Sequence, residues 1–157
     1  MNLIKLTSFL FNAGQAGYGT GDYSNWIKEK NGSTSILYEE KDWEMNDNFF
    51  GGEPFGGRLV VFYKKKPVWI MVYYGYVLNN NKLPIEKVYK FLQNSLIKTP
   101  KSFPIRGPKK FIENDFIYKN SWLGKINQFA GEEKILANKS EIYKANYFGG
   151  LVNLRSG

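Results

Sequence analysis

Residues 55–79, FGGRLVVFYKKKPVWIMVYYGYVLN, are similar to residues 129–153, FAGEEKILANKSEIYKANYFGGLVN. Each segment has an aromatic residue followed by two small residues, a polar turn with a lysine, and then an aromatic pair and a glycine. Strand-forming residues on both sides of a polar turn predict a β-hairpin. At a constant offset of 74 residues, identical residues stand at Asn46/Asn120, Phe55/Phe129, Gly57/Gly131, Lys65/Lys139, Tyr73/Tyr147, Gly75/Gly149 and Asn79/Asn153.

The sequence predicts a helix before each of these segments. In the first, apolar side chains from Leu3 to Ala13 fall on one helical face, and a glycine-rich loop follows. In the second, Pro84 stands at the first helical position, and apolar residues from Ile85 to Leu96 repeat at helical spacing. We therefore predict an α+β fold: a tandem duplication of a helix plus an antiparallel β-meander, packed as one pseudo-symmetric domain.

The predicted domain spans residues 1–157, with internal repeats over approximately 1–82 and 83–157. A lone meander exposes an apolar face, so we expect each copy to complete the core of the other. Such a pseudo-symmetric seam would be a natural place for a pocket.

Within the repeats, Asn46–Asn48 and Asn120–Ser121 have the composition of turns, and Phe111–Lys119 reads as one strand. The segment Val68–Leu78 is apolar on both faces for most of its length, which is typical of a central strand covered on both sides.

The composition limits the chemistry available to the chain. It has no cysteine and no histidine, which removes disulfides, thiolate chemistry, the commonest general base and the commonest zinc ligands. A metal site would need carboxylates alone, which favours magnesium or calcium. We expect no cofactor, and we favour a non-catalytic protein over an enzyme.

The formal net charge is +8, which indicates an anionic partner: a nucleic acid, a phosphate-bearing small molecule or an acidic surface. The alternative is that dispersed lysines only keep the protein in solution, because 19 of the 22 basic residues are lysine. The N-terminus predicts an amphipathic helix better than a signal peptide, and no segment reaches the length of a membrane span. We expect a cytoplasmic protein without membrane contact and leave a homodimer open.

Arginines are the most informative candidates for a binding site, because the guanidinium fork holds phosphate or carboxylate in a fixed geometry. Arg106 lies in PIRGP, between residues that stiffen the backbone; packing on an aromatic ring or capping a strand end is the alternative. Arg58 and Glu132 occupy equivalent positions in the two repeats. They would form oppositely charged walls of the seam, or else be ordinary surface residues or an ion pair.

Three tyrosines complete the predicted ligand-binding set. Tyr18 lies in the glycine-rich loop, where it could stack on a ligand ring or fill the core. Tyr74 and Tyr76 alternate with core-facing positions of their strand, and we expect them to face the seam. No residue is predicted to be catalytic or to bind a metal.

Several motifs in their order resemble an uncharacterised bacterial domain family of unknown function. They are FGG followed by KPVWIMVYYG in the first half, and PIRGPKKFIENDFIYKNSW, FAGEEKI and NYFGG in the second; FLFNAGQAGYG is a looser match. Members of that family occur alone or C-terminal to helix-turn-helix regulator domains, and the second arrangement implies a sensor role. The chain departs from the family where FGGRL replaces the acidic FAGEE form, which places Arg58 at a position expected to hold a carboxylate.

We predict a non-catalytic protein that binds an anionic, nucleotide-like small molecule as a sensor or a sequestering protein. The first alternative is an enzyme that uses carboxylates or a divalent metal on a phosphorylated substrate. The second is a nucleic-acid-binding protein, which we rank lower because the sequence shows neither a basic stripe nor a groove-reading helix.

Overall fold

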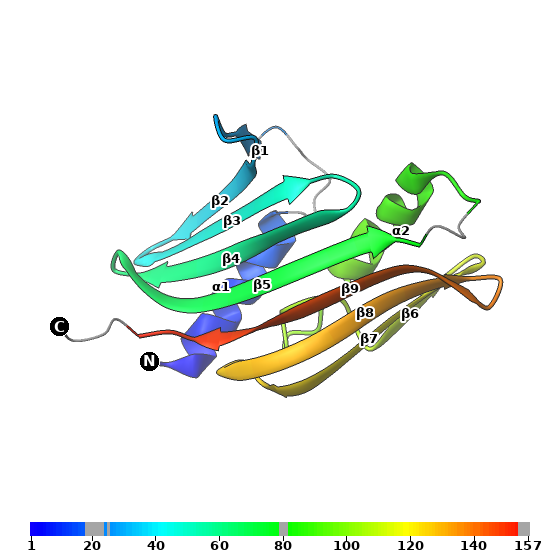
Figure 1. The fold of residues 1–157 in the computed structure, drawn as a ribbon. Helices are drawn as coiled ribbons and strands as arrows, with labels where there is room; N and C mark the ends of the chain where they lie inside the picture. Colours follow the sequence, from blue (N-terminus) through cyan, green and yellow to red (C-terminus); the bar gives the residue numbers. More distant parts are fainter. Residues whose placement is uncertain (18–23, 25, 79–81, 154–157) are drawn as a thin grey trace.

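The computed structural model describes residues 1–17, 24, 26–78 and 82–153. Its strands form one antiparallel sheet of nine strands in the order β1-β2-β3-β4-β5-β9-β8-β7-β6, and both helices lie on one side of it (Figure 1). The elements are α1 (Leu3–Ala16), β1 (Trp26–Lys28), β2 (Thr34–Glu40), β3 (Trp43–Gly51), β4 (Phe55–Tyr63), β5 (Lys66–Val77), α2 (Ile85–Ile97), β6 (Lys110–Glu113), β7 (Phe116–Lys125), β8 (Gln128–Ala137) and β9 (Ser140–Leu151).

The predicted fold class is wrong: the protein has a mainly β fold, not an α+β tandem duplication of helix-plus-meander units. The physical reason is the pairing of β5 with β9, which runs from Trp69↔Leu151 to Val77↔Tyr143. The backbone hydrogen bonds therefore continue across the middle of the molecule. The second half extends the sheet of the first half, so there is no seam between two stacked faces.

The hairpin predicted in each of the two similar segments is confirmed. β4 pairs with β5 through Phe55↔Gly75, and β8 pairs with β9 through Phe129↔Gly149. Each hairpin has one register shift near its turn, at Val61/Phe62 and at Ile135/Leu136.

The two predicted helices are also confirmed, and each buries one apolar stripe. Asn2 caps α1 by accepting a hydrogen bond from the backbone N–H of Lys5 at 3.1 Å, and Gly17 follows its last turn. The apolar stripe of α1 packs with Trp43, Val61 and Trp69 in a first core cluster. That of α2 (Val88, Phe91 and Leu92) packs in a second cluster with Tyr118, Ile135, Tyr143 and other residues of the sheet.

The opposite face of the sheet, called the open face below, carries no described helix (Figure 1). Side chains along each strand alternate between the two faces. In β5, Met71 and Tyr73 are buried on the helix side, whereas Val72 and Tyr74 are exposed on the open face. β5 is therefore central in the sheet, as predicted, but it is covered on one side only.

Two predicted turns lie inside strands instead. Asn46–Asn48 belong to β3, and Asn120–Ser121 belong to β7. The predicted strand Phe111–Lys119 is interrupted between β6 and β7, where Asn114 has a φ of 53°. Among the described residues, neither helix has the length and apolar character needed to cross a membrane.

Candidate ligand pocket

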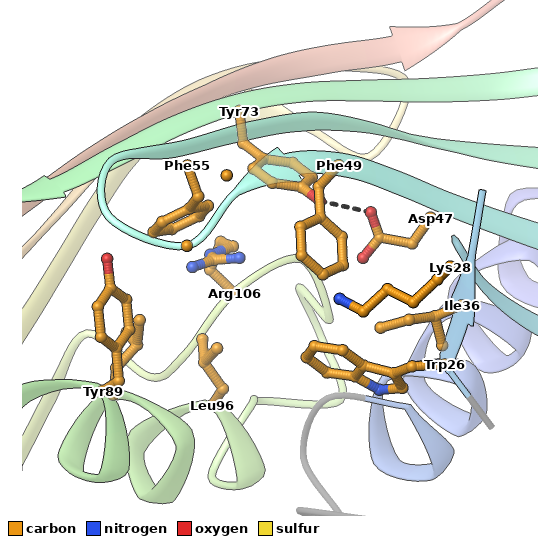
Figure 2. A pocket seen from close by; sticks show the side chains of 13 residues that line it. Trp26, Lys28, Ile36, Asp47, Phe49, Phe55, Tyr73, Tyr89, Leu96 and Arg106 are labelled. Atoms are coloured by element: carbon orange, nitrogen blue, oxygen red, sulfur yellow. Dashed lines mark hydrogen bonds between the residues drawn. The ribbon is translucent and has the colours of Figure 1, made fainter. Parts of the chain in front are cut away.

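A cavity of about 380 Å³ lies on the helix side of the sheet, between the strands of the first half and α2 (Figure 2). Its volume is in the range of pockets that bind small molecules. The described residues that line it are Trp26, Lys28, Ile36, Asp47, Phe49, Gly51, Gly52, Phe55, Tyr73, Tyr89, Leu92, Leu96 and Arg106.

Five of the thirteen lining residues are aromatic. Trp26 and Phe49 meet edge to face, with ring centroids 5.4 Å apart. Phe55 lies 6.1 Å from Tyr73 and 5.9 Å from Tyr89, again between centroids. Because rings packed in this way hold one another in place, the pocket offers a fixed apolar surface to a planar group.

Arg106 enters this aromatic pocket from the connector between α2 and β6, and its position is fixed by Glu133 of β8. The Arg106 Nε donates to Glu133 Oε2 at 3.0 Å, and Nη2 donates to Glu133 Oε1. The Glu133 side chain is fully buried and also accepts from the hydroxyls of Tyr118 (2.6 Å) and Tyr143 (3.1 Å). Burial lowers the pKa of Arg106, but the charge and hydrogen bonds of Glu133 outweigh it and raise that pKa well above its usual value.

This arrangement leaves one edge of the guanidinium for a ligand. Nε and Nη2 are turned toward Glu133, and Nη1 has no hydrogen-bond partner among the described residues. The guanidinium carbon lies 6.0 Å from the centre of the Tyr73 ring, and Figure 2 shows the group in the pocket between Phe55 and Leu96. Arg106 thus presents a charged donor whose orientation is set before any ligand arrives.

Hydrogen bonds from β7 hold the connector itself. Gly107, next to Arg106, donates its N–H to the Tyr118 hydroxyl at 3.0 Å, and its carbonyl accepts from Asn120 Nδ2 at 2.8 Å. A Cβ at Gly107 would lie 2.7 Å from the Tyr118 ring, so only glycine fits there. Burial, together with the charge of Glu133, raises the pKa of Tyr118 well above its usual value, so this hydroxyl stays a donor.

Asp47 and Lys28 add two more charged groups. Asp47 Oδ1 accepts from the Tyr73 hydroxyl at 2.6 Å (Figure 2). Lys28 Nζ donates to Thr34 Oγ1 at 2.8 Å. Burial raises the pKa of Asp47 to about 6, although the Tyr73 hydrogen bond and the charge of Arg106 act in the opposite direction. The charge that the pocket presents therefore changes around pH 6.

Glu53 links the β3–β4 loop to α2 at the side of the pocket. One carboxylate oxygen accepts from the backbone N–H of Val77 at 2.8 Å, and the other accepts from the Tyr89 hydroxyl. The Tyr89 ring is thereby fixed as a wall of the pocket. Within the described residues, no three His, Cys, Asp or Glu side chains cluster in a way that could hold a metal ion.

The model of a domain of unknown function (DUF5680) matches residues 47–152. The chain belongs to this family. The match includes Asp47, Arg106 and Glu133 but leaves out Trp26 and Lys28. No curated protein and no solved structure matches the chain.

Within the DUF5680 match, the structure separates the predicted ligand-binding residues. Arg106 lines the pocket, whereas Arg58, Tyr74, Tyr76 and Glu132 project from the open face. Tyr18 lies outside the described residues.

Arg58 and Glu132 are not brought together. Arg58 is on β4 and Glu132 on β8, with β5 and β9 between them. Arg58 borders a polar depression with Ser33, Ser35 and Asn48 among its lining residues. Glu132 forms ion pairs with Lys134 at 3.0 Å and Lys144 at 2.7 Å.

Sequence reasoning missed Asp47, Glu133 and the aromatic wall formed by Trp26, Phe49, Phe55 and Tyr89. The signal for Glu133 was its alternation with Glu132, which places the two carboxylates on opposite faces of β8. Asp47 gave no signal, because its neighbours Asn46 and Asn48 have the composition of a turn.

Proposed function

We propose that this protein is a non-catalytic binder of a small, planar, anionic molecule of nucleotide-like chemistry, held in the aromatic pocket. The observation that carries the proposal is Arg106, whose Nε and Nη2 are bound by Glu133 while its Nη1 edge is left to the pocket. Because this donor is already held in place, little side-chain entropy is lost when a ligand binds to it.

The aromatic walls supply the second half of the recognition. Trp26, Phe49, Phe55 and Tyr73 offer ring faces and edges to a planar group, and stacking on such rings does not need a specific pattern of hydrogen bonds. Lys28 and Arg106 would then contact an anionic substituent from two sides of the pocket. The pocket volume of about 380 Å³ is near the lower end for ligand sites, which favours a ligand of nucleoside or mononucleotide size over a dinucleotide.

A binder without catalysis would act as a sensor or as a sequestering protein. The resemblance to bacterial proteins that carry this domain after a helix-turn-helix regulator supports the sensor role by analogy alone. We place the protein in the cytoplasm in this proposal, since nucleotide-like molecules are found there.

One observation favours a second candidate, an enzyme that uses carboxylates on a phosphorylated substrate. Asp47 has a pKa of about 6 and lies in the same pocket as Arg106 and Lys28. A carboxylate with such a pKa can exchange a proton near neutral pH. In that case Asp47→Asn would abolish turnover of the bound molecule, whereas a pure binder would return the molecule unchanged.

The test begins with the molecule that purifies with the protein, identified by native mass spectrometry, or with a panel of mononucleotides where none is carried. Arg106→Lys and Lys28→Gln should each weaken binding about ten- to a hundredfold, because each loses a charge-assisted hydrogen bond. Lys28 is exposed and outside the core, so Lys28→Gln should leave the melting temperature unchanged.

Arg58→Lys is the matched control, since it makes the same chemical change on the open face. Titration calorimetry of the three variants measures ligand affinity and shows which face of the sheet holds the ligand. Loss of small-molecule binding in Arg58→Lys, with Lys28→Gln unaffected, would move the ligand to the open face and refute the pocket.

A further inference from the structure

Four lysines form a continuous row across the open face. Lys110 of β6 lies opposite Lys119 of β7, Lys119 opposite Lys134 of β8, and Lys134 opposite Lys144 of β9. Tyr76 of β5 lies opposite Lys144 and extends the row into the centre of the sheet. We call Lys110, Lys119, Lys134 and Lys144 the lysine ladder.

The ladder is electrostatically unfavourable by itself, because like charges directly opposite each other on neighbouring strands repel. Glu132 offsets part of the charge through ion pairs with Lys134 and Lys144, and Glu141 lies 3.3 Å from Lys134. Lys110 and Lys119 are exposed and have no ion-pair partner among the described residues. They line a shallow depression of about 360 Å³. Its other lining residues are Lys109, Asn120, Ser121, Lys134 and Glu132, and the Glu132 carboxylate is already paired with Lys134 and Lys144. This end of the ladder can accept an anion without displacing an internal partner.

Exposed aromatic rings lie beside the ladder. Tyr74 and Phe148 are 53% and 60% exposed, which is high for aromatic residues in the central strands of a sheet. They lie on adjacent strands, Tyr74 opposite Asn146 and Phe148 opposite Val72, so they are diagonal neighbours. A Cβ at Gly56 would lie 2.9 Å from Tyr74 Cδ2, so the Tyr74 ring leans over Gly56 along the sheet. Tyr76 packs beside the ring at a tilt, with centroids 6.1 Å apart, and the exposed part of Tyr74 remains available to a stacking partner.

We propose that the open face binds single-stranded nucleic acid, with the lysine ladder on the phosphates and Tyr74 and Phe148 stacked on bases. Cations that follow a backbone beside rings that stack on bases are the two elements of single-strand binding without sequence preference. Neighbouring strands are about 4.8 Å apart, so the ladder spans about 14 Å, a few nucleotides of an extended strand.

The same features argue against a duplex as the partner. Bases in a duplex are stacked on one another and have no free ring face for Tyr74 or Phe148. A duplex is read in the major groove by a helix or a two-stranded ribbon, and the open face has neither among its described residues. This surface lies on the other side of the sheet from the aromatic pocket, so the proposal does not depend on what the pocket binds.

The experiment is fluorescence anisotropy of the full chain with labelled oligo-dT and oligo-U of about 12 nucleotides, a length within the range of sheet-based single-strand sites. The double variant Lys110→Gln, Lys119→Gln should weaken binding at least tenfold at about 50 mM salt. It should also reduce the slope of log Kd against log salt by about 1.4, since each lost phosphate contact on a single strand contributes about 0.7.

The rings are tested with Tyr74→Leu, Phe148→Leu, which keeps apolar side chains on the strands but removes the stacking surface. It should weaken binding about tenfold or more and leave the salt slope unchanged, because no phosphate contact is lost. The control is Lys87→Gln, Lys98→Gln, which removes the same charge from exposed positions in and beside α2, and which should retain at least half of the wild-type affinity.

Four outcomes would overturn the proposal. The wild-type protein fails to bind at low salt, or the control pair weakens binding as much as the ladder pair does. A duplex of the same length binds equally well and the leucine variant binds like wild type, which makes the face a general polyanion surface. Light scattering shows a dimer that the leucine variant disrupts, with no affinity for oligonucleotides, which makes the face a contact between two copies. Thermal melting of every variant identifies any that fail to fold.

Discussion

At the level of single residues, the contact between Arg106 and Glu133 has two roles. It fixes the orientation of the guanidinium that faces the pocket, and it pairs the buried charge of Glu133. Glu133 accepts hydrogen bonds from Arg106, Tyr118 and Tyr143, and all of these groups are donors. An acceptor surrounded in this way cannot be replaced by a group that also donates. This network gives Arg106 a contribution to the stability of the fold in addition to its position in the pocket.

Glu133→Gln should therefore destabilise the protein strongly. The amide places an N–H donor among existing donors and leaves the Arg106 charge without its counterion, and losing one partner of a buried pair costs about 3–5 kcal/mol. Urea denaturation measures the effect. Glu132→Gln is a control at the next position of β8, on the open face, and its effect should stay within about 1 kcal/mol. Equal effects of the two variants would contradict the role given to the buried network.

Asp47 should make stability depend on pH in the acidic range. Its folded pKa of about 6 is above the ordinary aspartate value of 3.8, so the folded state holds this proton more tightly than the unfolded state does. Stability should accordingly fall as the pH rises from about 4 to about 6, and the penalty should persist above pH 6. It amounts to at most about 3 kcal/mol, at about 1.4 kcal/mol for each pKa unit.

Asp47→Asn should remove this penalty, because the amide oxygen still accepts from Tyr73 but carries no charge. The variant should melt higher than wild type at pH 8 and at the same temperature near pH 4. Asp42→Asn, at an exposed residue in the turn between β2 and β3, is the control and should show no such divergence. A constant difference between Asp47→Asn and wild type from pH 4 to pH 8 would contradict the assignment.

At the level of residues, the sequence singled out Arg106, which lines the pocket, but not its neighbours there. Its proline and glycine neighbours point to a rigid loop, which can be read locally. Asp47 and Asn120 are residue types common in turns, yet both lie inside strands. Asp47 accepts a hydrogen bond from the Tyr73 hydroxyl at 2.6 Å, and Asn120 accepts one from the Tyr147 hydroxyl at 2.7 Å. These hydrogen-bond partners are distant in sequence and outweigh the preference of Asp and Asn for turns. The propensity of a residue type for turns or strands contains no information about such partners.

At the level of elements, hairpins and helices could be predicted because their signals are local. The turn at Lys64 and Lys65, where both residues have positive φ, connects two strands of strong β propensity. The arrangement of the hairpins could not be predicted in the same way. The residues of β5 and β9 suit two arrangements equally well: two sheets packed face to face, or one sheet in which these strands pair edge to edge. Only the pairing of β5 with β9, which are distant in sequence, distinguishes the two arrangements.

The pairing of β5 with β9 leaves no room for a Cβ at Gly149. A Cβ at Gly149 would lie 2.0 Å from the carbonyl oxygen of Ile70 and 2.8 Å from Cα of Met71, both atoms of the neighbouring backbone. Gly149→Ala should therefore force the central strands apart and destabilise the protein by about 1–3 kcal/mol, a cost typical of overpacking.

Gly14→Ala is the matched substitution in α1, where a Cβ would meet no atom within 4 Å. It should stabilise the protein by about 0.5–1 kcal/mol through helix propensity. The two alanine variants should thus shift the urea midpoint in opposite directions. A neutral Gly149→Ala would indicate that the two halves of the sheet are held together by side-chain packing alone.

At the level of the whole molecule, the continuous sheet gives the protein two faces with different properties. The helix side encloses the core and a pocket whose charged groups are largely held by internal partners. The open face displays the lysine ladder and two exposed rings, and its row of positive charge arises because β6, β7, β8 and β9 lie side by side. We had ranked a nucleic-acid partner low because no basic stripe is visible along the sequence, but the row runs perpendicular to the chain direction.

The same continuity predicts that neither half of the chain folds by itself. The first core cluster combines Leu6, Phe9 and Trp69 with Phe129 and Tyr147 from the second half, so a cut removes apolar partners from α1. It also leaves β5 or β9 as a long unpaired edge, which is a template for aggregation. Residues 1–82 and 83–157 expressed separately should therefore be insoluble or lack a cooperative thermal transition. Expressed together, they should assemble and elute as one species, because the β5–β9 pairing can form between two chains. A soluble single half that melts cooperatively would show that folding does not require the pairing of β5 with β9.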